Sequence, residues 1–341
     1  MAAVFTNETK RLVGLDIGSA SVKLVELSGC SGAYQLENLA LAIIESPGDP
    51  DASARALSSV REACSPETRR VAISVAGPHV AVRSFRFPKM DAAEVKGAVW
   101  YEGSQVIAFD LADSYVDYTV MDKAKDDTRT EVLLVAATRP EIDLKTKLVS
   151  GSGFEPRVVS VDALVLLEAL VNRPSVSGTV AVVDVGARVT SIGIAAKGTV
   201  PFMRDIEVAG DAYTRAVGET LGVGFPEAEK AKVTESDSNP TVVRAMEAVN
   251  RRLVGEVARS LDYYKSRDNG RIIDHVFLCG GGSGLPHLRD ELARTSGLEV
   301  SLWSPLEDVY VDEGRFDRTT VNDLAPFVAL ASALAMTEEA H

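Results

Sequence analysis

Residues that build covalent or metal-centred sites are scarce in this sequence. Of its 341 residues, only three are cysteine and four are histidine. Cys30, Cys64 and Cys279 lie far apart and form no C-x-x-C motif, so neither a disulfide framework nor a cysteine-ligated metal site is expected. The histidines show no ligand spacing either. A small, odd number of cysteines is typical of a protein of the reducing cytoplasm.

Positive charge and long apolar runs are scarce as well. The 36 lysines and arginines stand against 49 aspartates and glutamates, which gives a formal net charge of −13. This balance argues against a nucleic-acid-binding protein and against an electrostatic grip on anionic lipids. The first residues, MAAVFTNETKR, hold no signal-peptide core, and the longest weakly polar run, residues 324–336, contains a proline and is too short to cross a bilayer. We therefore expect a soluble protein that meets a membrane only through partners.

What the sequence does contain is a repeated polar turn. Residues 11–17 and 21–27 have the alternating, β-branched pattern of strands, and the small polar residues between them predict a β-hairpin. The same arrangement returns in VAVVDVGARVTSIGIAAKG, residues 180–198. The aspartates of the two D-x-G motifs, Asp16 and Asp184, are 168 positions apart (184 minus 16), about half of the chain. Because a chain of this length exceeds one typical core, the repeat predicts two related lobes that each begin with this hairpin.

The remaining segments alternate between strand and helix patterns, which predicts an α/β protein. The expected strands lie at residues 34–44, 70–75, 80–90, 115–122, 130–138, 157–162 and 272–279. The expected helices lie at residues 52–64, 91–107, 163–171, 211–231, 241–267, 285–295 and 325–336.

The two polar turns carry the residue types that a phosphate chain with bound Mg²⁺ requires. These are backbone N–H groups in a small-residue turn, a cation, and carboxylates that hold the metal, often through water. The first hairpin offers Asp16, the turn Gly18-Ser19-Ala20-Ser21 and Lys23, and the second offers Asp184 and Gly186. If the two lobes face each other, the hairpins bind one phosphate chain from opposite sides. The simpler alternative is that D-x-G between strands is only turn chemistry.

Two further motifs suggest contacts with a nucleoside. In FLCGGGSGLPHL, residues Gly280, Gly281 and Gly282 follow an apolar strand, and glycines there let a flat ring lie against the backbone where a Cβ would collide. The ordinary alternative is a strand-to-helix loop that needs positive φ angles. Glu229 and Lys232 lie one turn apart on a predicted helix and can face one target, the alternative being a solvated salt bridge.

The ordered motifs DIGSASVK, VDALVLLEAL, VVDVGARVTSI, FLCGGGSGLPHL and LAPFVALASALAM resemble the actin-like ATPase superfamily of actin, heat-shock chaperones, sugar kinases and FtsA. GLDIGSASVKLVEL, GAVWYEGSQVIAFDLADSYVDYTVM and VARSLDYYKSR are similar to one branch, the PilM proteins of type IV pilus assembly. The resemblance covers residues 11–336. It implies an α/β, actin-like (ribonuclease H-like, duplicated) two-lobe fold with an FtsA/PilM-type α+β insertion in the first lobe. The implied domains are a first lobe at 10–80 with 156–178 and 322–337, an inserted α+β subdomain at 81–155, and a second lobe at 179–321 whose helical part spans 211–271.

The resemblance also implies ATP and Mg²⁺ as cofactors, with at most weak hydrolysis. Its phosphate and metal motifs match Asp16, Gly18, Ser19, Ser21, Lys23, Asp184 and Gly186. Its adenosine motif matches Gly280, Gly281 and Gly282, while Glu229 and Lys232 match the contacts with ribose or adenine. Asp162 matches the position that orients the attacking water, so Asp162 and Asp184 are the candidate catalytic residues. The chain departs from the family pattern at Ala20, Ala209 and Ser332, where glycine is usual.

The function implied by the resemblance is that of a cytoplasmic, ATP-binding adaptor that binds the N-terminal tail of PilN and links the cytoplasmic and inner-membrane parts of the pilus machine. The tail would lie in a groove between the insertion and the first lobe, held by edge-strand pairing or by an aromatic pocket. Further implied partners are the inner-membrane platform, cytoplasmic motor ATPases, and copies of the same chain in an oligomer or ring. The alternatives are an active ATPase, a sugar or acetate kinase, an FtsA-like filament protein, and the cytoplasmic domain of a type II secretion L-type protein.

Overall fold

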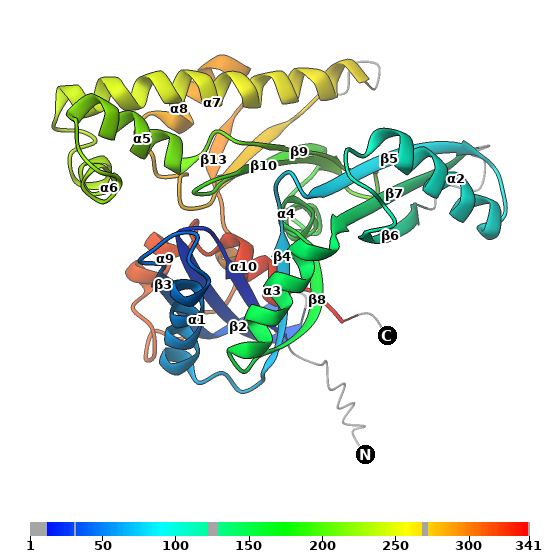
Figure 1. Cartoon of the computed structure of the whole chain (residues 1–341), viewed down its shortest axis with the longest axis horizontal. Coiled ribbons are helices and arrows are strands. Elements are labelled where there is room, and N and C mark those ends of the chain that lie inside the picture. Colours follow the sequence, from blue (N-terminus) through cyan, green and yellow to red (C-terminus); the bar gives the residue numbers. More distant parts are fainter. Residues whose placement is uncertain (1–11, 31, 122–128, 268–271, 340–341) are drawn as a thin grey trace. The chain divides into compact units, whose positions relative to one another are not determined.

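The computed structural model describes residues 12–30, 32–121, 129–267 and 272–339 (Figure 1). Residues 10 and 11, where the first predicted lobe and strand begin, lie outside these ranges. By its internal contacts the chain forms two compact units. The first comprises residues 1–74, 146–160 and 304–341, and the second comprises 75–145 and 161–303. The predicted domain boundaries remain a prediction.

A five-stranded sheet forms the centre of the first unit. Its strands, in sheet order, are β3 (Ala33–Ile43), β2 (Ser21–Cys30), β1 (Val13–Ile17), β4 (Arg70–Val75) and β8 (Glu155–Val161). β1 pairs antiparallel with β2 and parallel with β4, and β2 pairs antiparallel with β3. The predicted opening hairpin is therefore confirmed as β1–β2.

Helices cover both faces of this sheet. On one face, α1 (Pro50–Cys64) begins at the N-cap Asp49 and buries Ala52, Ala56, Leu57 and Val60 against β1 and β2. Side chains alternate along a strand, so Val13 and Leu15 face α1 while Gly14 faces the other side. There α10 (Ala329–Ala335) lies so close that a Cβ on Gly14 would meet the Ala331 carbonyl oxygen. The apolar, small-residue sequence of α10 permits this approach.

Three further helical segments belong wholly or partly to the first unit. They are η1 (Pro305–Asp308), α9 (Arg318–Leu324) and α3 (Arg139–Gly151), the last of which runs from the second unit into the first. The predicted helix over 325–336 is only partly correct, because residues 325–328 form turns and α10 begins at Ala329. Pro326, which has no N–H to donate, accounts for the break. Ser332 stands on α10 where the family usually has glycine. Its hydroxyl donates to the Val328 carbonyl, so this polar group is hydrogen-bonded within the helix.

The second unit contains a sheet with the same pattern of strands. In sheet order they are β11 (Phe202–Ile206), β10 (Thr190–Ala196), β9 (Thr179–Val185), β12 (His275–Cys279) and β13 (Val300–Leu302). β9 pairs antiparallel with β10 and parallel with β12, as β1 does with β2 and β4. The predicted internal repeat is confirmed. β1, β2, β3, β4 and β8 correspond in sheet order to β9, β10, β11, β12 and β13, and the pairs β1–β2, β1–β4 and β2–β3 also correspond in direction to β9–β10, β9–β12 and β10–β11.

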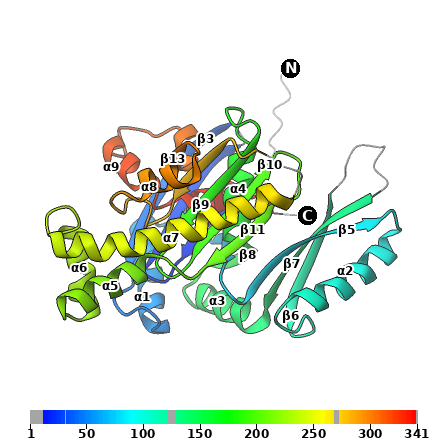
Figure 2. The same ribbon diagram turned by 90° about the horizontal axis from the view of Figure 1, so that it is seen from above.

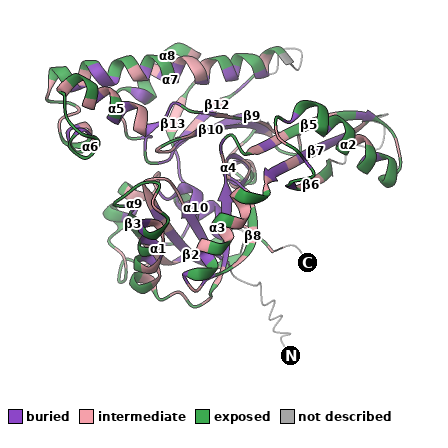
Figure 3. Ribbon diagram, in the orientation of Figure 1, coloured by how far each residue is buried: buried purple, intermediate pink, exposed green. Residues whose placement is uncertain are grey.

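Five helices accompany this second sheet. They are α4 (Asp162–Val171), α5 (Gly210–Leu221), α6 (Phe225–Thr234), α7 (Pro240–Arg267) and α8 (Leu288–Ser296). The long α7 buries one stripe of apolar residues and exposes the opposite face (Figure 3). The prediction of a single helix over 211–231 is wrong. Gly222, at φ +69°, ends α5 in the left-handed region, and α6 restarts at Phe225-Pro226, where proline fits the first turn.

Between β4 and β8 the chain inserts a small α+β structure. Its sheet has the order β5 (Val80–Pro88), β7 (Arg129–Thr138) and β6 (Ser114–Met121), and α2 (Ala92–Val106) packs on it (Figure 2). α2 begins with a capping box in which Asp91 and Glu94 satisfy each other's backbone N–H groups. The predicted strands and helix of the insertion are confirmed. The sequence analysis missed α3, which follows β7 directly.

Candidate functional site

The first predicted phosphate hairpin brings a carboxylate and a cation into contact. Asp16 on β1 lies directly opposite Lys23 on β2. The Lys23 Nζ donates to Asp16 Oδ2 at 2.8 Å, and the two side chains are only 12% and 11% exposed. Beyond them the chain turns at Gly18, whose N–H donates to the Ser21 carbonyl at 3.1 Å. Ser19 and Ala20 form the tip and remain partly exposed.

The second hairpin repeats this turn with different side chains. The Gly186 N–H donates to the Val189 carbonyl at 3.0 Å, as Gly18 does to Ser21. Asp184 takes the place of Asp16, but Ser191 stands opposite it where Lys23 stands in the first hairpin. The two hairpins therefore share a backbone turn but differ in the residue opposite the aspartate, which is a lysine in the first and a serine in the second.

The glycine-rich loop after β12 lies directly on the second hairpin. Gly280, at φ +86°, would place a Cβ 2.1 Å from Asp184 Oδ1, and a Cβ on Gly282 would lie 2.4 Å from Val185 Cγ1. The Gly282 N–H also donates to the Val185 carbonyl at 2.7 Å. Packing against β9 thus requires glycine at these two positions, whether or not a ligand binds.

One other glycine of this loop, Gly284, has no such explanation. Gly281 and Gly284 are exposed, and a Cβ on Gly284 would meet no atom within 4 Å. Gly284 does not have a positive φ. Open space beside a glycine that needs neither conformational freedom nor close packing is what a flat ligand would require. Gly284 was not among the predicted site residues, although it belongs to the same motif.

Glu229 and Lys232 form more than a solvated salt bridge. They pair at 2.6 Å on α6, and both contact Thr214 on α5. The Thr214 hydroxyl donates to Glu229 Oε2 at 2.5 Å and accepts from Lys232 Nζ at 3.0 Å. Lys232 is 12% exposed, whereas Glu229 is 43% exposed. The sequence analysis did not connect Thr214 with this pair, because the contact joins two helices that the sequence presents as one.

The start of α5 joins this group to the second hairpin. The N–H groups of Gly210 and Asp211 donate to the carbonyls of Gly186 and Ala187. Burial raises the pKa of Asp211, and the nearby Arg188, Arg215 and Lys232 oppose that shift. Ala209, the departure from glycine, is buried in extended backbone as the N-cap of α5. The hydrogen bonds of Gly210 and Asp211 therefore hold the backbone around the second turn although residue 209 is not a glycine.

The structure groups the predicted site residues into two sets, one in each unit. The first unit holds Asp16, Gly18, Ser19, Ser21 and Lys23. The second unit holds Asp162, Asp184, Gly186, Glu229, Lys232, Gly280, Gly281 and Gly282. Within the second set, Asp184 and Gly280 are in contact. Asp162 opens α4, where its Oδ1 is buried.

Within the described ranges, no group of three or more histidine, cysteine, aspartate or glutamate side chains could hold a metal ion. A Mg²⁺ ion at Asp16 or Asp184 would therefore take its other ligands from water and phosphate oxygens, which Mg²⁺ commonly does.

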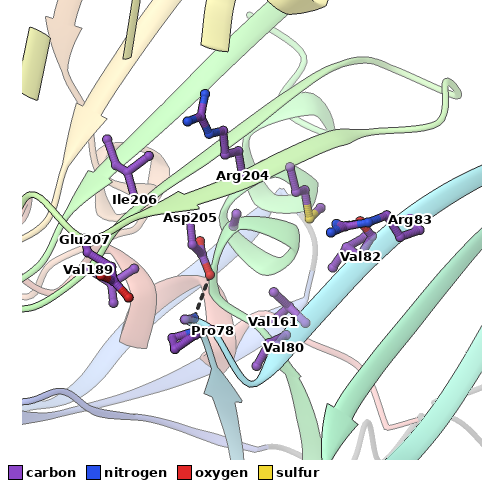
Figure 4. A pocket seen from close by; sticks show the side chains of 13 residues that line it. Pro78, Val80, Val82, Arg83, Val161, Val189, Arg204, Asp205, Ile206 and Glu207 are labelled. Carbon is purple, nitrogen blue, oxygen red and sulfur yellow. Dashed lines mark hydrogen bonds between the residues drawn. The ribbon is translucent and has the colours of Figure 1, made fainter. Parts of the chain in front are cut away.

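A separate cavity of about 380 Å³ lies within the second unit (Figure 4). It is bordered by β5 on one side and β11 on the other, each of which is an edge strand of its sheet. Asp205 of β11 accepts a hydrogen bond from the Gly77 N–H at 2.6 Å and so ties β11 to the segment that leads into β5. None of the 13 lining residues is aromatic, so the cavity offers apolar and charged side chains and strand backbone but no aromatic pocket.

The duplicated sheets with matching hairpins define an actin-like fold, and comparison with solved structures agrees. The ethanolamine utilization protein EutJ from Carboxydothermus hydrogenoformans superposes with a TM-score of 0.58 at 15% identity, covering 95% of this chain and 89% of that chain. MreB5 of Spiroplasma citri bound to ADP superposes with a TM-score of 0.50 at 11% identity, covering 93% and 98%. At such identities the likeness concerns the fold alone.

The family is defined more narrowly by the sequence. The sequence model described as type IV pilus assembly protein PilM matches residues 14–339, and the chain belongs to this family. It is also similar, at 25% identity and a TM-score of 0.84, to a chain of the PilM–PilN type IV pilus biogenesis complex, with 96% of this chain and 98% of that chain covered. Among the described helices, none has the length and apolar character needed to cross a membrane.

Proposed function

We propose that this chain is a nucleotide-binding adaptor of type IV pilus assembly, which binds ATP·Mg²⁺ and the N-terminal cytoplasmic tail of PilN. One observation carries the nucleotide part. The polar turn after β1 recurs after β9, and the second turn packs against a loop that contains the exposed Gly284, which no steric contact requires to be glycine. The turns would hold the phosphates, and the loop would hold the adenosine.

The residue roles in this proposal follow from charge and position. Asp16 and Asp184 would hold Mg²⁺ through water, Lys23 would neutralise phosphate oxygens, and the N–H groups of the two turns would donate to them. Glu229 and Lys232 would contact the ribose or adenine beside the glycine loop. Gly186, Gly280, Gly281 and Gly282 would contribute backbone rather than side-chain contacts.

Calorimetric titration with ATP·Mg²⁺ tests the nucleotide part. We expect Asp16→Asn, Lys23→Met and Asp184→Asn each to weaken binding, because each removes a charge that the bound phosphate or metal requires. Asp262→Asn is the matched control, since Asp262 is a 76% exposed aspartate on α7. Binding that is absent in the unmodified protein, or unchanged in all three variants, would contradict the proposal.

Hydrolysis is the second candidate function, and Asp162 at the start of α4 is the residue that would serve it. Multi-turnover phosphate release that is lost in Asp162→Asn, while ATP binding persists, would favour an ATPase. Phosphate release equal in the two proteins would favour an adaptor in which ATP acts by being bound.

For the PilN tail we propose the cavity bordered by β5 and β11. The similarity to a chain of the PilM–PilN complex supports the partner. The two edge strands and the lack of aromatic lining favour addition of an extended segment by strand pairing. Exposed Arg83 on β5 stands across the cavity from Asp205 and Glu207 on β11, and this difference in charge would orient the bound segment (Figure 4).

Fluorescence anisotropy with a labelled PilN N-terminal peptide tests the partner and its place separately. We expect Met203→Lys to abolish binding, because it places a charged side chain where an apolar one lines the cavity. Val233→Lys, at a 67% exposed position of α6, is the matched control. No binding to the unmodified protein would reject the partner, and equal binding by both variants would reject the cavity. Contacts with the inner-membrane platform, with motor ATPases and with copies of the chain remain part of the proposal.

A further inference from the structure

A buried polar bridge joins three segments of the second unit. Asn250 lies on the core stripe of α7, is only 1% exposed, and has the apolar neighbours Met246, Leu253 and Val254 on that stripe. An amide in such surroundings is costly unless its groups are hydrogen-bonded. Whether asparagine is tolerated at this buried position therefore depends on the hydrogen bonds that its amide group makes.

Both ends of the Asn250 amide are occupied. Its Oδ1 accepts from the hydroxyl of Tyr213, a fully buried residue of α5, at 2.6 Å. Its Nδ2 donates to the carbonyl of Pro286 at 3.0 Å. Burial raises the pKa of Tyr213, which keeps the hydroxyl proton that this bridge uses. The bridge thus runs from α5 through α7 to the end of the glycine-rich loop.

The segment that receives this bridge is conformationally unusual. His287, directly after Pro286, has a φ of +61°, a left-handed conformation that is strained for a residue other than glycine. Such a conformation persists only where the surroundings over-determine it. At its other end the loop is fixed by the Gly282 N–H on the Val185 carbonyl. Gly284, with open space beside it, lies between these two anchors.

We propose that Asn250 and Tyr213 are positioning residues for nucleoside recognition. Their bridge holds the Pro286 carbonyl, and with it the backbone of residues 280–287, in the shape that presents Gly281 and Gly284 to a purine base. This inference rests on the proposed nucleotide binding and adds a role for two residues that touch no ligand. Because the bridge ends on the glycine-rich loop, its loss affects the nucleoside part of a ligand and leaves the phosphate part to the two hairpins.

Two ligands and four variants test this role. ADP·Mg²⁺ reports on the nucleoside together with the phosphates, and tripolyphosphate·Mg²⁺ reports on the phosphates alone. Tyr213→Phe removes one bond, Asn250→Leu removes both, and the double variant replaces both side chains by apolar groups of similar shape. Ser260→Ala is the control, because it removes a different buried hydrogen bond from the same helix.

We expect Asn250→Leu to weaken ADP binding about tenfold while tripolyphosphate binding stays within about twofold. The double variant should recover part of the thermal stability that Asn250→Leu loses, because it leaves only the Pro286 carbonyl without its partner, whereas Asn250→Leu also leaves the Tyr213 hydroxyl without one. It should not recover ADP affinity. A purely structural role predicts the opposite, with ADP affinity returning as stability returns, and that result would overturn the proposal. Equal loss for both ligands would overturn it too. Failure of the unmodified protein to bind either ligand is a different result, which rejects the proposed nucleotide function itself.

Discussion

The loop after β12 contains glycines of two kinds, and substitution by alanine, which adds one methyl group, should distinguish them. We expect Gly280→Ala to lower the free energy of unfolding by about 1–3 kcal/mol, because the new Cβ would collide with Asp184 and Val185 and because φ is +86°. We expect Gly284→Ala to leave stability unchanged but to weaken nucleotide binding. Chemical denaturation and calorimetry of the two variants measure both effects. A Gly284→Ala protein with unchanged nucleotide affinity would show that the open space is not used.

The three cysteines should differ strongly in reactivity. Cys30 is exposed, whereas burial and the neighbouring Glu26 raise the pKa of Cys64 to about 11. Cys279 is fully buried, which raises its pKa well above the ordinary value of a thiol. At pH 8 iodoacetamide should therefore modify Cys30 first, as mass spectrometry of tryptic peptides can show, and Cys30→Ser should abolish the fast phase. Since the raised pKa of Cys64 favours the neutral thiol in the folded state, its contribution to stability is lost as pH rises from 9 towards 11.

Residues of the candidate site were predictable where the sequence itself holds the signal. Asp16, Lys23 and Asp184 are found from polar residues inside a strand–turn–strand pattern that occurs twice. Thr214 and Asn250 carry no such signal. Each works through a contact with another helix, and one threonine or asparagine in a helical pattern looks the same whether or not such a contact exists.

At the scale of elements, the approach of α10 to β1 depends on the absence of one side chain. A Cβ on Gly14 would lie 1.8 Å from the Ala331 carbonyl oxygen and 2.5 Å from the Ala335 nitrogen. We expect Gly14→Ala to force the helix off the sheet and to destabilise the first unit by about 1–3 kcal/mol. Gly97→Ala is the matched control, because Gly97 is exposed on α2 with no atom near its missing Cβ. There alanine should stabilise by about 0.5–1 kcal/mol. Thermal unfolding of both variants measures whether stability falls in the first and rises in the second.

Helix boundaries were the least predictable elements. The apolar periodicity continues through Gly222, so the pattern alone joins α5 to α6. The break depends on a left-handed glycine and a following proline, and its consequence is functional, because it lets α6 fold back and place Glu229 and Lys232 against α5. Hairpins were more predictable, since the turn residues and the alternating pattern both lie within a few positions of one another.

At the scale of the whole molecule, the two units have separate hydrophobic cores. We therefore expect more than one transition in scanning calorimetry without ligand. If one nucleotide is bound by residues of both units, ATP·Mg²⁺ at 100 times its dissociation constant should stabilise both by up to about 2.7 kcal/mol. Gly14→Ala and Gly280→Ala assign the transitions, since each weakens one unit. A ligand that shifts a single transition would place the whole binding site in that unit.

The duplication was visible in the sequence because both copies keep the same turn at half-chain spacing. The positions of the two sets of site residues were not visible in the sequence, because strand order depends on which distant segments of the sequence pair with one another. Only the structure shows that β8 and β13, which share no motif, take equivalent edge positions in the two sheets.

The close packing of α10 on β1 also has a consequence for protein synthesis. Residues 304–341, which include the helix that covers the hairpin β1–β2, are synthesised after the hairpin and after every segment of the second unit. Until then the Gly14 face of the nascent sheet has no helix over it. The second unit can therefore complete its fold first, while this face of the first unit stays uncovered until α10 has been synthesised.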